Sequence, residues 1–139
     1  QCALGISQLS KLDTFIKKRN LIALNYNKAL KKYEKFNIPI VSKNVKHSYH
    51  IYPLRINFKK TSTDKKKLFV KMKKSGINLM VHYIPIHLQP FYKKKYNFKL
   101  GDYKISEKFY REQCSIPIYP NLNTKQQNFI INKLIKFTN

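Results

Sequence analysis

The chain of 139 residues is short of several residue types, and each shortage excludes a class of site. Three glycines are too few to build the glycine-rich loops that cradle phosphate groups. The two cysteines, Cys2 and Cys114, lie far apart, which excludes a disulfide framework and a cysteine-based zinc site and suits a reducing cytoplasm. No uninterrupted apolar run approaches the roughly 18 residues of a membrane-spanning helix, so we expect no membrane partner.

Carboxylates are also scarce, because six Asp and Glu residues stand against 29 Lys and Arg residues, for a net charge of +23. They are scattered along the chain, and no pair is placed for general acid–base catalysis. His82 and His87 are five residues apart without a nearby carboxylate, which is not a recognised zinc spacing. The sequence therefore predicts no catalytic residue, no metal and no complete active site in this chain.

The positive charge is carried almost entirely by lysine, which makes up 26 of the 29 basic residues. Proteins that read nucleic acids favour arginine, whose planar fork grips phosphate and guanine with two hydrogen bonds. Lysine, asparagine, isoleucine and tyrosine all have A/T-rich codons, so genome composition could produce the same bias. We expect a solvated lysine surface that attracts anions, including nucleotide diphosphates, and that binds nucleic acid only non-specifically. A lysine-rich nucleic-acid-binding module remains the alternative.

Apolar residues recur at helical spacing from Gly5 to about Phe36, which predicts one long amphipathic helix with a local interruption at Asn20. Pro39 ends this pattern, because the residue before a proline disfavours helical geometry. A helix of this length is typical of a connection between domains. We therefore expect a division into residues 1–36, an inter-domain helix, and residues 37–139, a small domain.

The remaining sequence alternates between strand and helix patterns. Residues 48–58, 77–83 and 115–120 read as strands, and helices are expected near residues 63–75, 106–113 and from Asn123 or Thr124 onward. Gly76 is a signal for the end of the helix expected near residues 63–75. Three strands with helices to cover them predict an α/β (α+β) layered fold.

The densest group of polar side chains lies between Val81 and Tyr92. His82, Tyr83, His87 and Gln89 follow an expected strand, where α/β folds place ligands, and Pro85 and Pro90 make the loop rigid. Imidazole and phenol groups can bond to sugar hydroxyls or phosphate oxygens. A packed aromatic loop with internally satisfied histidines is the alternative.

Two further residues are expected to be structural. His50, which shares a face with Tyr52 and Leu54 in the strand expected over residues 48–58, is expected to be a core histidine. Cys114 has no candidate base near it in sequence, so we expect no cysteine nucleophile.

Four segments form an ordered set of motifs along the chain. They are QCALGISQL with the following Leu12-Asp13, SYHIYP over residues 48–53, VHYIPIHLQPFY over residues 81–92, and SIPIYP over residues 115–120. This set resembles the C-terminal part of DegT-type sugar-nucleotide aminotransferases. The likeness spans nearly the whole chain in order. The segment from His82 to Tyr92 is most similar to the branch that makes 4-amino-4,6-dideoxy-N-acetylhexosamine nucleotides for pseudaminic acid or spore-coat polysaccharide.

The resemblance implies the C-terminal domain of an aspartate-aminotransferase-like fold with a small, mainly antiparallel sheet. It implies an enzyme that uses pyridoxal 5′-phosphate to move an amino group from glutamate to a 4-keto-6-deoxy sugar nucleotide, and that acts as a homodimer. The Schiff-base lysine and the cofactor site would lie in a large domain upstream of this chain, so the chain alone is expected to be inactive. His82 and Tyr83 match positions that reach the sugar nucleotide, with His87 and Gln89 close by. A truncated relic without activity is a third possibility.

Overall fold

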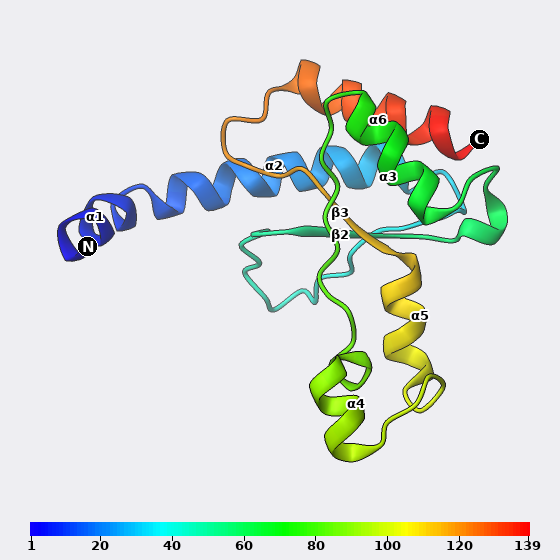
Figure 1. Ribbon diagram of the computed structural model, residues 1–139. Helices are drawn as coiled ribbons and strands as arrows, with labels where there is room; N and C mark the ends of the chain where they lie inside the picture. Colours follow the sequence, from blue (N-terminus) through cyan, green and yellow to red (C-terminus); the bar gives the residue numbers. More distant parts are fainter.

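A computed structural model describes all 139 residues (Figure 1). The elements in chain order are α1 (Cys2–Leu9), α2 (Leu12–Leu30), β1 (Phe36–Asn37), β2 (Tyr52–Ile56), η1 (Phe58–Lys60), α3 (Lys65–Lys74), η2 (Ile86–Leu88), α4 (Pro90–Tyr96), α5 (Lys104–Glu112), β3 (Gln113–Ile116) and α6 (Thr124–Thr138). Helix α6 contacts both α2 and α3, and these helices accompany a three-stranded sheet, which confirms the expected α/β layered class.

The N-terminal region is two helices rather than one, which corrects the expectation of a continuous helix to Phe36. The break falls at Ser10 and Lys11, where the Ser10 hydroxyl donates to the Ser7 carbonyl oxygen at 2.9 Å. Asn20 lies inside α2 and does not interrupt it, because its side-chain amide donates to the carbonyl oxygens of Ile16 and His47. Helix α1 buries no residue and lies at the far end of α2 from the C-terminus (Figure 1).

The sheet has the order β1-β2-β3 with both pairs antiparallel. The alternation expected for residues 48–58 is confirmed over β2, where Tyr52, Leu54 and Ile56 are fully buried. The expected strand over residues 77–83 is wrong, because that segment makes one isolated bridge, Met80 to Ser115. The third strand is instead β1, whose two residues are too short to give a periodic signal.

Strand β3 (Gln113–Ile116) starts two residues earlier and ends four residues earlier than the expected segment 115–120. It stops at Ile116 because Pro117 has no N–H group to donate to a ladder. The sequence predicted a loop bracketed by Pro85 and Pro90 and no helix directly after it, whereas Pro90–Tyr96 form α4. Pro90 is at the start of this helix, where its missing N–H group costs nothing. Helix α5 covers residues 104–112 against the expected 106–113.

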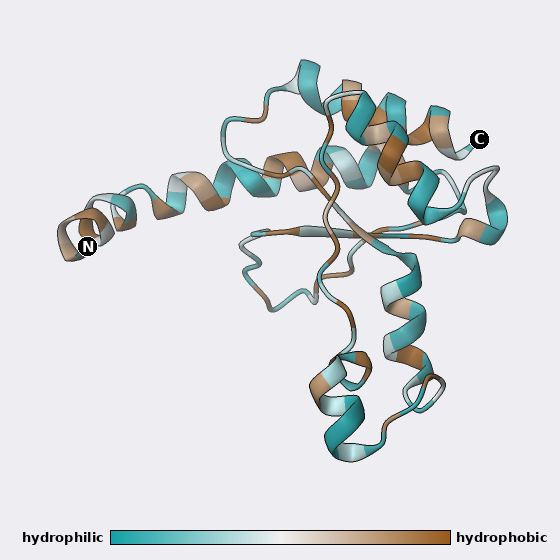
Figure 2. Cartoon of the chain, in the orientation of Figure 1, coloured by the Kyte–Doolittle hydropathy of each residue, from teal (hydrophilic) through white to brown (hydrophobic).

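The other two helices follow their sequence signals. Asp64 accepts a hydrogen bond from the backbone of Lys67 at the start of α3, and Gly76 follows its end with φ of 76°. Asn123 and Gln126 form a reciprocal capping box at the start of α6. Hydrophobic residues, drawn in brown, occur where α3 and α6 face the rest of the core, and hydrophilic residues, drawn in teal, occupy much of the outer side of these helices (Figure 2).

Candidate functional site

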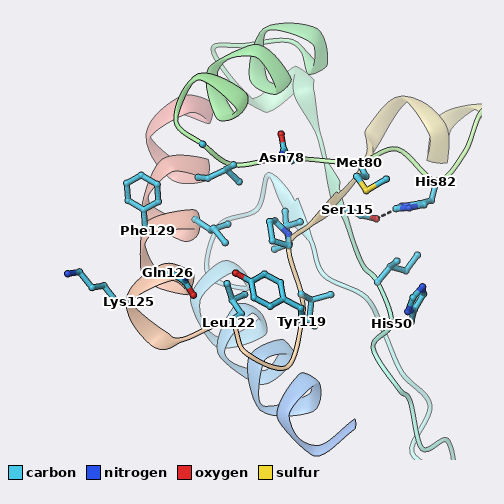
Figure 3. A pocket seen from close by; sticks show the side chains of 17 residues that line it. His50, Asn78, Met80, His82, Ser115, Tyr119, Leu122, Lys125, Gln126 and Phe129 are labelled. Carbon is cyan, nitrogen blue, oxygen red and sulfur yellow. Dashed lines mark hydrogen bonds between the residues drawn. The ribbon is translucent and has the colours of Figure 1, made fainter. Parts of the chain in front are cut away.

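A cavity of about 870 Å³ opens between the segment after α3, the segment after β3 and the first half of α6 (Figure 3). Its floor is apolar and includes Ile77, Ile116 and Phe129. Polar groups stand at its edges: His50, Asn78, His82, Ser115, Tyr119, Lys125 and Gln126. An apolar pocket with a few polar groups at its edge is the usual form of a ligand site.

His82 lies at one end of this cavity and is held on two sides by β3. Its backbone N–H donates to the side-chain oxygen of Gln113 at 3.1 Å, and its ring Nδ1 lies 2.9 Å from the Ser115 hydroxyl. The Gln113 amide nitrogen in turn donates to that hydroxyl at 2.8 Å. The backbone pairing between Met80 and Ser115 is therefore not continued at His82, whose N–H group bonds to the Gln113 side chain instead of a backbone carbonyl.

Tyr83 follows His82 and projects outward, with 73% of its surface exposed. Its ring stands edge-on to the His82 imidazole with the two centroids 4.8 Å apart. The peptide bond between these two residues is cis. Tyr83 does not line the cavity, so it can meet a ligand only outside the cavity mouth.

His87 lies away from His82, in the lobe formed by η2, α4 and the start of α5. It is 6% exposed, and its ring Nε2 lies 3.0 Å from the Glu107 carboxylate. The backbone N–H of Gly101 and the side chain of His87 both donate to Glu107, and these bonds lower the pKa of its carboxyl group. Because an ionised carboxylate can only accept, Nε2 must carry the proton that it shares. Among the four expected residues, His87 thus fits the alternative of an internally satisfied histidine.

Gln89 is half-buried, and its side-chain amide turns back to the carbonyl oxygen of Ile84 at 3.4 Å. This contact lies within the loop between Ile84 and Pro90, whereas the pair of His87 and Glu107 ties the same loop to α5. The structure therefore brings His82 and Tyr83 together and places His87 and Gln89 in a separate cluster.

His50 is exposed, which corrects the expectation of a core histidine. Tyr49 takes a left-handed backbone with φ of 45°, and this shifts the alternation so that Tyr49 is buried and His50 faces the cavity. Gln113 and Ser115 are the site residues that the sequence reasoning missed. A polar residue at each end of the short run QCS, both buried, is the only local signal that could have pointed to them.

The cavity residues do not fit pyridoxal 5′-phosphate on their own. That cofactor needs a lysine for its Schiff base and an acidic or basic partner for its ring nitrogen. Lys125 is the one lysine at the cavity, it is exposed, and it extends away from the floor (Figure 3). No carboxylate lines the cavity, and the best-buried carboxylate, Glu107, is already bonded in the other lobe.

Cys114 is fully buried in β3, and burial raises the pKa of its thiol to about 12, so it stays protonated and unreactive. No cluster of three or more His, Cys, Asp or Glu side chains is arranged to hold a metal ion. None of the helices is both long and apolar enough to span a membrane.

The sequence model of the DegT/DnrJ/EryC1/StrS aminotransferase family matches residues 1–135. Among curated proteins, the UDP-4-amino-4,6-dideoxy-N-acetyl-beta-L-altrosamine transaminase of Campylobacter jejuni is 37% identical over 131 residues, covering 93% of this chain and 34% of the relative. The spore coat polysaccharide biosynthesis protein SpsC of Bacillus subtilis is 30% identical over 132 residues, covering 94% of this chain and 34% of the relative. The chain thus spans about a third of the length of the curated relatives that it matches.

Solved structures share the fold. Helicobacter pylori PseC, described as an aminotransferase of pseudoaminic acid biosynthesis, superposes with a TM-score of 0.87 at 32% identity, covering 98% of this chain and 36% of PseC. DesV of S. venezuelae has the same TM-score at 24% identity, covering 98% of this chain and 35% of DesV, and supports the fold alone. These matches confirm the aminotransferase-like fold and the family resemblance read from the sequence motifs.

Proposed function

Because the chain belongs to the DegT/DnrJ/EryC1/StrS aminotransferase family, we propose that it is the small C-terminal domain of a sugar-nucleotide aminotransferase. The enzyme would move an amino group from glutamate to a 4-keto-6-deoxy sugar nucleotide for a cell-surface glycan or polysaccharide. The observation that supports this most strongly is the 37% identity to a nucleotide-sugar transaminase over 93% of the chain. The unpaired cysteines fit a cytoplasmic enzyme.

The contribution of this chain would be to bind substrate. His82 stands at the cavity edge with one ring nitrogen fixed by Ser115, and the exposed Tyr83 ring stands beside it. His87 and Gln89 would shape the loop rather than touch the substrate, because each is bonded within the loop or to Glu107. The lysine-rich surface would attract the diphosphate of the sugar nucleotide over a longer range.

The N-terminal helices would supply the contact with the missing part of the enzyme. Leu4, Ile6 and Leu9 of α1 are each more than 60% exposed, and no residue of α1 is buried (Figure 2). Leu21 and Leu24 continue the exposed apolar surface on α2. A soluble domain seldom leaves such a surface uncovered. We propose that a large domain, which would carry pyridoxal 5′-phosphate and its lysine, packs on residues 1–36, and that the enzyme is a homodimer.

A chimera tests the proposal. The third of the Campylobacter transaminase that this chain matches is replaced by this chain, and transfer from glutamate to the 4-keto sugar nucleotide is measured. We expect activity from the chimera and none from this chain alone, because the cofactor site lies elsewhere. A folded, cofactor-loaded chimera with no transfer activity would contradict the proposal.

The role of His82 is tested within the same chimera. His82→Ala should raise KM for the sugar nucleotide more than it slows the half-reaction with glutamate, because the imidazole binds only the sugar nucleotide. Asn128→Ala, on the exposed face of α6, is the matched control and should change neither. Equal losses in both half-reactions with His82→Ala would refute this role.

The charge of +23 also predicts weak binding to nucleic acid. Because such binding is driven by counterion release, its affinity should fall steeply as the salt concentration rises and should not depend on the nucleic-acid sequence. A strong preference for one sequence or structure at physiological salt would instead favour the nucleic-acid-binding module.

A further inference from the structure

Two buried polar side chains of β3 are unexplained by the fold. Gln113 is fully buried and Ser115 is 5% exposed. They are two residues apart, so their side chains lie on the same face of β3. Both side chains contact His82, in the segment that pairs with the edge of β3 through the bridge between Met80 and Ser115. Burying an amide and a hydroxyl is costly unless every polar atom finds a partner. Their bonds are therefore worth following atom by atom.

The direction of each hydrogen bond in this cluster follows from one fixed donor. The backbone N–H of His82 can only donate, so the Gln113 atom that it faces at 3.1 Å must be the oxygen. The amide nitrogen of Gln113 then faces Ser115 Oγ at 2.8 Å and donates to it. This leaves the Ser115 O–H group as a donor that still needs an acceptor.

The acceptor is His82 itself. Nδ1 of its ring lies 2.9 Å from Ser115 Oγ, and no other side-chain or backbone acceptor bonds to that hydroxyl. If Nδ1 carried a proton, Ser115 would accept two hydrogen bonds and its own buried O–H would have no partner, which is the costly case. Nδ1 is therefore the bare nitrogen, and the proton of the neutral ring sits on Nε2.

We infer that Gln113 and Ser115 are positioning residues that hold His82 as its Nε2–H tautomer, so that the open ring nitrogen donates a hydrogen bond to an acceptor oxygen of the ligand. A phosphate, hydroxyl or carbonyl oxygen of a sugar nucleotide suits such a donor, and a ligand N–H group does not. The identity of this ligand rests on the proposed function. The assignment of the tautomer depends only on the hydrogen bonds among His82, Gln113 and Ser115. In its neutral form His82 then cannot accept a proton at its ligand-facing nitrogen.

The tautomer is measured by long-range ¹H–¹⁵N correlation on the ¹⁵N-labelled chain, at a pH where the rings are neutral. The chain provides its own references. His47 Nδ1 accepts from the backbone N–H of Tyr49 and is therefore locked as Nε2–H, whereas the exposed ring of His50 makes no hydrogen bond. We expect the His82 nitrogens to match His47. A match to His50, or a protonated Nδ1, would overturn the inference.

Ser115 variants separate positioning from mere packing. Ser115→Ala should move the His82 nitrogen shifts toward those of His50, whereas Ser115→Thr, which keeps the hydroxyl, should restore the locked pattern. Unchanged shifts in a folded Ser115→Ala chain would overturn the inference. If that variant does not fold, the wild-type comparison with His47 and His50 still decides.

Titration with UDP links the tautomer to binding. In Ser115→Ala the Nδ1–H tautomer becomes populated, so the competent fraction of the chain falls and the dissociation constant for UDP rises by the inverse of that fraction, which the nitrogen shifts of the same variant supply. Absence of UDP binding to the wild-type chain would count against the proposed function alone, because the tautomer is read in the free chain.

Discussion

The hydroxyl of Tyr26 ties the long helix α2 to the wall of the cavity, and removing it should loosen both. Tyr26 is fully buried, and its O–H donates to the carbonyl oxygen of Pro117 at 2.8 Å. Its ring packs against Tyr52 with the centroids 5.2 Å apart. Burial, with a smaller effect from Tyr52, raises the pKa of Tyr26, so the phenol stays protonated and remains a donor at neutral pH.

Tyr26→Phe keeps the ring and removes only this bond. A neutral hydrogen bond contributes about 0.5–1.5 kcal/mol, and an orphaned buried acceptor adds about 1–3 kcal/mol. Pro117 is half-buried, so water can partly replace the lost donor, and we expect the free energy of unfolding to fall by about 1–2 kcal/mol. With a urea m-value of about 2 kcal/mol per M, the midpoint should fall by about 0.5–1 M.

The assay is urea unfolding at neutral pH, followed by circular dichroism, with the m-value checked for constancy. Tyr119→Phe is the matched control, because Tyr119 is 43% exposed and its hydroxyl makes no hydrogen bond. That variant should stay within about 0.5 kcal/mol of the wild type. Equal midpoints for the two variants would refute the reasoning that the Tyr26 hydroxyl holds the cavity wall.

Two further predictions concern buried polar groups. Hydrogen bonds from Gly101 and His87 lower the pKa of the Glu107 carboxyl group in the folded chain. The ionised carboxylate should therefore stabilise the fold at pH values above its pKa in the unfolded chain, and this stabilisation should be lost as the pH falls through its pKa in the folded chain. The urea midpoints of wild type and Glu107→Gln should therefore differ at pH 7 and converge in acid, and a difference that is constant with pH would contradict this. In a thiol assay, the exposed Cys2 should react at once and the buried Cys114 only after denaturant is added; two fast thiols would show that β3 is not buried as described.

The sequence predicted elements best where the signal was local. Asp64, Asn123 and Gly76 mark helix ends through hydrogen bonds or backbone angles that involve neighbours within a few residues. The alternation through Tyr52 to Ile56 predicted which face of β2 is buried. By contrast, the two-residue β1 is too short to show a period, and the break after Ser10 interrupts an otherwise helical pattern.

The sequence by itself determined the family, since its motifs lie in order along nearly the whole chain, and it determined which residue types could meet a ligand. It could not tell which histidine keeps a ring nitrogen free for a ligand. The Nε2 atom of His87 bonds to Glu107, 20 residues along the chain, and the Nδ1 atom of His82 bonds to Ser115, 33 residues along the chain. Such partners meet only when α5 and β3 pack beside the loop, and no periodicity records a contact at that separation. Tertiary structure alone therefore decided that His82 presents a free ring nitrogen while His87 does not.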